Sequence, residues 1–257
     1  MNSEILAYLL LAYAASDHVF GDREAAARRH AGDLQPGEAL GHVPVVVLCH
    51  LVAVLPAASG AGAALSVGVA VAHTLIEALR SALPRRSGAA HLSFAFTLLA
   101  HLVVVVAAAA QWDEWTRAIV RTTALEADVW LPALSGEVVV ARAAVVAAAG
   151  ILAARAGSVL VATTLEELRA TPPDDGELRF EPRLGRAIGV LERLVVVTLV
   201  LVDAWGGIGL ILAAKSVARF KELESRAFSE YYLVGTLTSV LVAILTGLGA
   251  SLALGAL

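Results

Sequence analysis

Charged residues are scarce in this chain. Asp, Glu, Lys and Arg together make up 16% of its 257 residues, whereas hydrophobic residues make up 58%. A soluble domain contains about 25% charged and about 45–50% apolar residues. Runs such as Leu102–Ala110 and Leu194–Val202 contain no charged residue. The composition therefore argues against a soluble globular domain and predicts an integral membrane protein.

Cysteine and excess positive charge are also lacking. The single cysteine, Cys49, excludes a disulfide bond within the chain and leaves the redox compartment undecided. The formal net charge of -4 gives no support for nucleic-acid binding, so we expect no nucleic-acid partner. The opening stretch MNSEILAYLLLAYAASD has no basic segment and no clear cleavage site. We therefore expect it to be a retained first span and not a signal peptide.

Eight stretches approach the length of about 20 mostly apolar residues that a membrane-spanning helix needs. These stretches are Glu4–Phe20, His42–Ala58, Gly60–Leu79, His91–Ala110, Val138–Val161, Ala187–Asp203, Gly206–Phe220 and Tyr231–Leu254. Prolines, which break helices, lie between them or, at Pro56, close to the end of one. These prolines are Pro56, Pro84, Pro132, Pro172 and Pro173.

The stretch Leu194–Ala214 allows two interpretations. It is either one span with Asp203 at its centre or a hairpin that turns at the sequence DAWGG. With a hairpin, most basic loop residues follow spans one, three, five and seven, and cytoplasmic loops carry an excess of Lys and Arg. These residues are Arg23, Arg28, Arg29, Arg80, Arg85, Arg86, Arg169, Arg179, Arg183, Arg186, Arg219, Lys221 and Arg226. We therefore predict an all-α polytopic protein of the bacterial inner membrane, with about eight transmembrane helices and both termini outside the cytoplasm.

Composition and expected helices divide the chain into four regions. Residues 1–110 form a four-helix, histidine-containing membrane region. Residues 111–137 contain three of the four tryptophans, and tryptophan favours the membrane–water interface, so an interfacial amphipathic segment is expected there. Residues 138–170 are expected to form a long fifth helix, and residues 171–257 a C-terminal region of three helices.

Histidines and carboxylates gather toward the predicted cytoplasmic ends of the first four spans. His73 and Glu77 are four residues apart and share a helix face. Asp17 closes span one, and His101 lies about 15 Å into span four at 1.5 Å per residue. Imidazole and carboxylate ligands suit Zn or Fe(II), so these residues are candidate ligands for a divalent metal. Glu77 is also the candidate catalytic residue.

The alternatives to a metal site are structural. Glu77 can pair with Arg80, and the buried histidines can form a polar network with the backbone. His42 is expected to be a loop or interface residue, although His42 and His50 open span two on the same side. His30 and His91 are expected to be solvated.

A second polar cluster lies in the C-terminal region. Glu192 and Arg193 are about 10 Å into the bilayer, a depth at which an isolated charge costs about 3 kcal/mol, so pairing is expected. Glu192 is expected to pair with Lys215 or Arg219, and Glu230 with Arg219 or Arg226. The candidate binding or gating residues are Glu192, Arg193, Lys215, Arg219, Glu222 and Glu230. The cluster is interpreted as an ion-pair clasp, as a gate, or as a pocket for an anionic ligand or lipid headgroup.

The stretches GRAIGVLERL and LAAKSVARFKELESRAFSEYYLVGTLTS, within Gly185–Ser239, resemble a signature of a family of bacterial membrane proteins designated domain of unknown function 3307. The N-terminal region resembles the same family more loosely. Asp17, His73, Glu77 and His101 fit positions of the family's His and Asp pattern. Tyr13, His18, Gly21, Thr97 and Leu98 depart from it, and these departures remove two ligand-type residues.

Two functions are compatible with these patterns. The first is a non-enzymatic membrane protein, namely a transporter, a channel or a partner subunit, in contact with the lipid bilayer and with a homo-oligomer or another membrane protein as partner. The second is an intramembrane metal-dependent hydrolase that acts on a lipid-linked substrate, with Asp17, His73 and His101 holding the metal and Glu77 as ligand or general base. The loss of ligand-type residues at Tyr13 and Thr97 favours the first.

Overall fold

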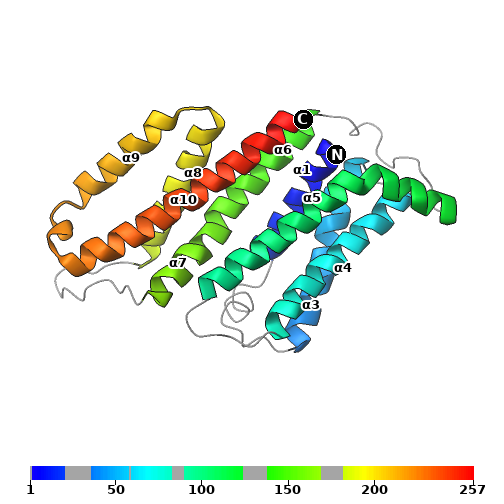
Figure 1. Cartoon of the computed structure of the whole chain (residues 1–257), viewed down its shortest axis with the longest axis horizontal. Helices are drawn as coiled ribbons and strands as arrows, with labels where there is room; N and C mark the ends of the chain where they lie inside the picture. The colour runs from blue at the N-terminus through cyan, green and yellow to red at the C-terminus, as the bar shows by residue number, and fades with distance from the viewer. Residues whose placement is uncertain (1, 21–35, 58, 83–89, 124–137, 169–181) are drawn as a thin grey trace. The chain divides into compact units, whose positions relative to one another are not determined.

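A computed structural model of the chain describes residues 2–20, 36–57, 59–82, 90–123, 138–168 and 182–257. Within these ranges the secondary structure is helical, with no strand, as the composition predicts (Figure 1). The chain forms two compact units. Unit 1 comprises Met1–Arg86, Leu92–Ala148 and Ala253–Leu257, and unit 2 comprises Ser87–His91 and Ala149–Leu252.

Unit 1 contains the N-terminal helices. These are α1 (Ser3–His18), α3 (Pro36–Ala53), the short 3-10 turn η1 (Leu55–Ala57), α4 (Gly60–Ala82) and most of α5 (Ala90–Thr122). Helix α3 packs against both α1 and α4. The side chain of Asn2 caps α1 by accepting a hydrogen bond from the backbone N–H of Ile5 at 3.1 Å, because the first amides of a helix lack intrahelical acceptors. The backbone N–H of Asn2 donates to the carbonyl of Ala109 at 3.0 Å, which fixes the start of α1 against α5.

Unit 2 contains a hairpin and, from Ala149 on, the C-terminal part of one long interrupted helix. Helix α6 (Val138–Ile151) continues through a π-helical turn, η2 (Leu152–Ala156), into α7 (Gly157–Glu167). Helix α8 (Pro182–Leu201) packs against η2, α7 and α9 (Trp205–Ala218). After the 3-10 turn η3 (Glu222–Glu224), α10 (Arg226–Ala256) returns along α8. A Cβ added at Gly247 would come within 2.8 Å of Val200, so glycine is needed where α10 approaches α8.

The helix break predicted at DAWGG is confirmed, because α8 ends at Leu201 and α9 begins at Trp205. Asp203 has a φ of 57°, a left-handed conformation that Asp adopts more readily than most residues. Its carboxylate accepts a hydrogen bond from the indole N–H of Trp205 at 2.5 Å. The prediction that the turn extends to Gly207 is wrong, because Gly207 is helical. A Cβ there would lie 2.9 Å from the side chain of Leu199, so this glycine permits close packing of the two arms.

Four helical stretches are long and apolar enough to cross a membrane. They are Gly60–Arg80, Leu92–Thr122, Val138–Glu167 and Arg226–Ala256. Gly41–Ala53 and Trp205–Ala218 are apolar but shorter. On α10, leucines exposed by more than half recur at every fourth residue from Leu233 to Leu245, which is a face suited to lipid. Exposed apolar side chains of this kind favour contact with the bilayer.

Helix α5 continues as one helix from Ala90 to Thr122, past residue 110, where the sequence placed a boundary. Trp112 and Trp115 therefore belong to this helix. Several residues used in the predictions lie outside the described residues, namely Gly21, Arg23, Arg28, Arg29, His30, Pro84, Arg85, Arg86, Trp130, Pro132, Arg169, Pro172, Pro173 and Arg179. The side chains of His91 and Arg183 are likewise not described.

Candidate metal site and charged pocket

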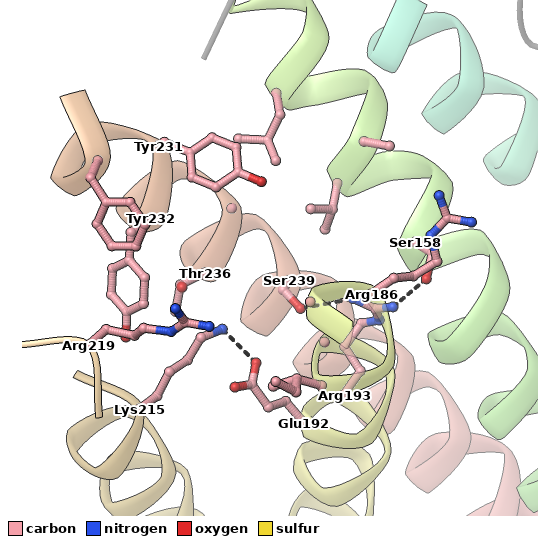
Figure 2. A pocket seen from close by; sticks show the side chains of 18 of the residues that line it. Ser158, Arg186, Glu192, Arg193, Lys215, Arg219, Tyr231, Tyr232, Thr236 and Ser239 are labelled. Atoms are coloured by element: carbon pink, nitrogen blue, oxygen red, sulfur yellow. Dashed lines mark hydrogen bonds and ion pairs between the residues drawn. The ribbon is translucent and has the colours of Figure 1, made fainter. Parts of the chain in front are cut away.

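The predicted pairing of Glu192 with a base from the return helix is confirmed. Lys215 Nζ on α9 donates to Glu192 Oε2 on α8 at 2.6 Å, as Figure 2 shows. The lysine ammonium also lies 5.6 Å from the centre of the Tyr232 ring, within the range of a cation–π contact. Two adjacent antiparallel helices that each carry one charge at a similar depth bring these groups together, because neither can be left unpaired in apolar surroundings.

Arg193, the next residue along α8, points into unit 2 and has neutral partners. Its Nε donates to the carbonyl of Ala153 at 2.6 Å and its Nη2 to the carbonyl of Ala154 at 3.3 Å. Its remaining bonds go to the hydroxyls of Ser158 at 2.5 Å and Ser239 at 3.1 Å (Figure 2). The side chain is 3% exposed. Through these contacts Arg193, a predicted binding or gating residue, joins α8, η2, α7 and α10.

The π-helical turn explains how Arg193 finds carbonyl acceptors inside a helix. A π turn shifts the hydrogen-bond pattern by one residue and can turn carbonyl oxygens toward a neighbouring donor. Ala153 and Ala154 both lie in η2, and Gly157 follows it directly. A Cβ at Gly157 would lie 2.9 Å from Arg193 Nε, so only glycine leaves room for the guanidinium. The sequence contains no signal that predicts a π turn here.

The other charged residues of the cluster pair locally. Arg219 Nη1 donates to Glu222 Oε1 at 3.2 Å, and Arg226 Nε donates to Glu230 Oε1 at 2.9 Å. The second of these pairs is solvent-exposed, with side-chain exposures of 92% and 65%. The pairing of Glu230 with Arg226, one of the two predicted partners, is confirmed.

In unit 1, Asp17 accepts hydrogen bonds from two histidines. Nε2 of His73 on α4 lies 2.9 Å from Asp17 Oδ1, and Nε2 of His42 on α3 lies 3.1 Å from the same oxygen. Asp17 lies in the last turn of α1. The expectation of a loop at His42 is wrong, because α3 begins at Pro36 and carries His42 to the carboxylate.

Two further histidines point unpaired nitrogens inward. Nδ1 of His50 lies 2.8 Å from the carbonyl of Val46, and Nδ1 of His101 lies 2.8 Å from the carbonyl of Thr97. A carbonyl oxygen only accepts, so Nδ1 carries the proton and a neutral imidazole has its lone pair on Nε2. In both histidines Nε2 is buried and has no hydrogen-bond partner among the described residues. Buried polar atoms are nearly always paired, so these two need an explanation.

The rings gather around His73. The centre of the His101 ring lies 4.3 Å from that of His73, and the centre of the His50 ring lies 5.8 Å from it. Tyr13 stacks on His101 with ring centres 4.9 Å apart. Asp17, His73 and His101 each offer one ligand atom, and these three atoms lie within 4.8 Å of one another. Of the four candidate ligands, the structure thus brings together Asp17, His73 and His101.

Glu77 is not a member of this three-residue group among the residues that the structure describes. Its Oε2 lies 3.6 Å from Nη1 of Arg80, which is the structural alternative that the sequence allowed. In place of Glu77, the structure brings His42 and His50 to the cluster. We call Asp17, His42, His50, His73 and His101 the histidine cluster.

The sequence model of one protein family, described as "Protein of unknown function (DUF3307)", matches residues 5–129. These residues include every member of the histidine cluster. Residues 5–129 therefore resemble this family, and we call them the DUF3307 domain. No curated protein and no solved structure matches the chain.

The match corrects one expectation, since the DUF3307 domain lies in the N-terminal half of the chain and not over Gly185–Ser239, where the resemblance was thought most specific. Within the domain, Tyr13 and Thr97 stand where ligand-type residues were expected. Tyr13 covers one face of His101, and the Thr97 carbonyl accepts the hydrogen bond of its Nδ1. Both residues therefore contact the cluster through His101.

Proposed function

We propose that this is an integral membrane protein that binds a divalent transition-metal ion, Zn²⁺ or Fe²⁺, between the helices of its DUF3307 domain. Asp17, His73 and His101 are the ligands, and the protein is of non-enzymatic type: a transporter, a channel or a partner subunit. Carboxylate and imidazole together are the ligands that these metals accept in proteins.

The observation that carries this proposal is the orientation of His101. Its Nδ1 is held by a carbonyl, and its buried Nε2 has no partner among the described residues while lying next to His73 and Asp17. A hydrogen bond from the far ring nitrogen is the usual way in which proteins orient a ligating histidine. Ligands in a tetrahedral zinc site lie about 3.4 Å apart, given metal distances of about 2.0–2.2 Å. The ligand atoms of Asp17, His73 and His101 now lie within 4.8 Å of one another, so small side-chain movements bring them to that distance.

His50 provides a fourth ligand of the same kind. Its Nδ1 is also held by a carbonyl, its Nε2 is also buried without a partner in the described part of the chain, and its ring is adjacent to His73. Four protein ligands form a closed site that holds a metal without leaving a place for a reacting water. This supports the non-enzymatic type.

The chain crosses the bacterial inner membrane eight times, with both termini outside the cytoplasm. Among the described residues, α4, α5, α6 to α7 and α10 are long and apolar enough to cross a membrane. The helices α1, α3, α8 and α9 complete the proposed set of eight. The basic residues after spans one, three, five and seven support the orientation. Helix α9, with 14 residues, is about 21 Å long and shorter than the hydrocarbon core of about 30 Å. Local thinning of the bilayer accommodates such a short span.

A metal-dependent hydrolase acting on a lipid-linked substrate is the second candidate. The observation that favours it is the number of ligands in the closest group, since three protein ligands leave a fourth position for water in catalytic zinc sites. In this case His50 remains outside the coordination sphere. Glu77, the expected general base, is paired with Arg80, so another group has to take that role.

The test is the thermal stability of the purified full chain in mild detergent, with and without added Zn²⁺. A ligand that binds only the folded state raises the melting temperature. We expect Zn²⁺ to stabilise the native protein and to have no effect on Asp17→Asn or His101→Gln. Glu77→Gln is the matched control, because it removes a carboxylate one turn from His73 and should keep the full response.

Loss of the Zn²⁺ response in His50→Gln supports the closed site and the non-enzymatic type. Retention of the response in His50→Gln, together with metal-dependent release of fatty acid or headgroup from a lipid extract, supports the hydrolase. If Asp17→Asn and His101→Gln respond to Zn²⁺ as the native protein does, the metal site is excluded.

A further inference from the structure

A pocket of about 400 Å³ opens at one end of unit 2. Arg186 lies in the second turn of α8, Arg219 follows the end of α9, and Tyr231 and Tyr232 lie in the second turn of α10 (Figure 2). All of these are helix ends, where a membrane-spanning bundle meets water, and tyrosine is enriched at that level. The pocket therefore lies at the level of the membrane surface when these helices span a bilayer.

The pocket has more positive than negative charge. Its lining includes the basic residues Arg186, Arg193, Lys215 and Arg219 and one carboxylate, Glu192. A second carboxylate, Glu222, pairs with Arg219 at the edge. Counting both carboxylates leaves an excess of two positive charges. An excess of this size around a cavity favours an anionic ligand.

The basic residues differ in how far their existing contacts leave them able to bind a ligand. Arg193 is committed to carbonyl and hydroxyl oxygens at its Nε, Nη1 and Nη2 atoms, so it shapes the pocket. Arg186 is exposed and makes no hydrogen bond or ion pair with another residue that the structure describes. Arg219 is held by a single contact with Glu222. Two guanidinium groups are thus available, and guanidinium matches the oxygens of a phosphate group with paired donors.

The rest of the wall combines apolar side chains with the hydroxyls of Ser158, Thr236 and Ser239. Val161, Leu165, Ile188 and Phe228 line it between the charged residues. An inorganic anion needs no such surface, whereas an anion attached to a hydrocarbon chain buries its first methylenes there. The arrangement of charge at the rim and apolar side chains within fits an amphiphile.

We propose that this pocket binds a phosphate group, with Arg186 and Arg219 as the contacting residues and Lys215 as a third positive charge behind them. The phosphate is carried by a lipid or is free in solution. Site and ligand are independent of the metal in the DUF3307 domain, and the tests of the two proposals use different residues and different probes.

The experiment measures lipid binding to the full chain by native mass spectrometry in detergent. The probes are dioleoylphosphatidic acid, which carries a phosphate monoester, and dioleoylphosphatidylcholine, in which a cation neutralises the phosphate. We expect the phosphatidic acid to bind about tenfold more tightly. Each of Arg186→Gln and Arg219→Gln should weaken its binding by about tenfold, the effect of losing one charge-assisted hydrogen bond.

Arg226→Gln is the matched control, because it removes the same charge near the same helix end but lies outside the pocket lining. It should leave the affinity unchanged. A melting-temperature series with inorganic phosphate distinguishes the two sources. A response to phosphatidic acid alone assigns the pocket to a lipid, and an equal response to inorganic phosphate assigns it to free phosphate. Equal binding of the two lipids, or an equal loss in Arg226→Gln, overturns the proposal.

Discussion

Lys215 Nζ lies 2.6 Å from Glu192 Oε2, across the two arms of the α8–α9 hairpin. The two side chains are 23% and 19% exposed, so both are partly removed from solvent. Removing one charge of such a pair destabilises the protein more than removing both, because the single remaining charge has no partner.

We therefore expect Glu192→Gln and Lys215→Met to destabilise the protein more when made singly than when combined. A fully buried broken pair costs about 3–5 kcal/mol and a surface pair about 0–1 kcal/mol. For this partly buried pair we expect roughly 1–3 kcal/mol for each single change. The melting temperatures of the two single variants and the double variant provide the measurement.

The exposed pair Arg226–Glu230 is the control for this cycle. Arg226→Gln should leave the melting temperature unchanged, since screening by water weakens such pairs. Additive losses in the Glu192 and Lys215 variants would show that the two side chains stabilise the protein independently.

Gly157→Ala should destabilise unit 2. The new methyl group would lie 2.9 Å from Arg193 Nε and 3.3 Å from Val242 Cγ1, so the guanidinium would have to leave its carbonyl acceptors. Overpacking of this kind costs about 1–3 kcal/mol. Gly209→Ala is the control, since a Cβ there meets nothing within 4 Å and alanine favours a helix. A lower melting temperature for Gly209→Ala than for Gly157→Ala would argue against the anchor.

The accessibility of position 204 to a labelling reagent tests the proposed topology. In a Cys49→Ala background, Ala204→Cys should react with a membrane-impermeant maleimide applied to intact spheroplasts, because the eight-span arrangement places the α8–α9 turn outside the cytoplasm. Labelling only after permeabilisation would show that the turn lies on the cytoplasmic side, which is the opposite orientation. No labelling under either condition would indicate a hairpin that enters the bilayer without crossing it.

The sequence predicts features that follow from hydropathy and pairing. The turn at Asp203 follows from charge alternation, and the Glu192–Lys215 pair follows from two charges at matching depth in apolar helices. The end of α5 was missed because the apolar run stops at Ala110, whereas the polar residues that follow continue the same helix to Thr122.

Other features depend on contacts that no local pattern encodes. The π turn at Leu152–Ala156 lies in a run of small residues without a distinguishing signal, so the inward course of Arg193 was not foreseen. The sequence alone does not show that α3 begins at Pro36, so His42 is expected in a loop or at the interface. The i, i+4 spacing placed His73 and Glu77 on one helix face. It could not decide whether Glu77 joins the histidines or pairs with Arg80, as it does in the structure.

The metal content of the protein tests the central claim most directly. The full chain, purified without chelator and dialysed against Zn²⁺ and then against metal-free buffer, is analysed by inductively coupled plasma mass spectrometry beside the double variant Asp17→Asn/His101→Gln. The account predicts about one zinc per native chain and none above background in the double variant. Zinc absent from the native chain, or equal in both proteins, would contradict it.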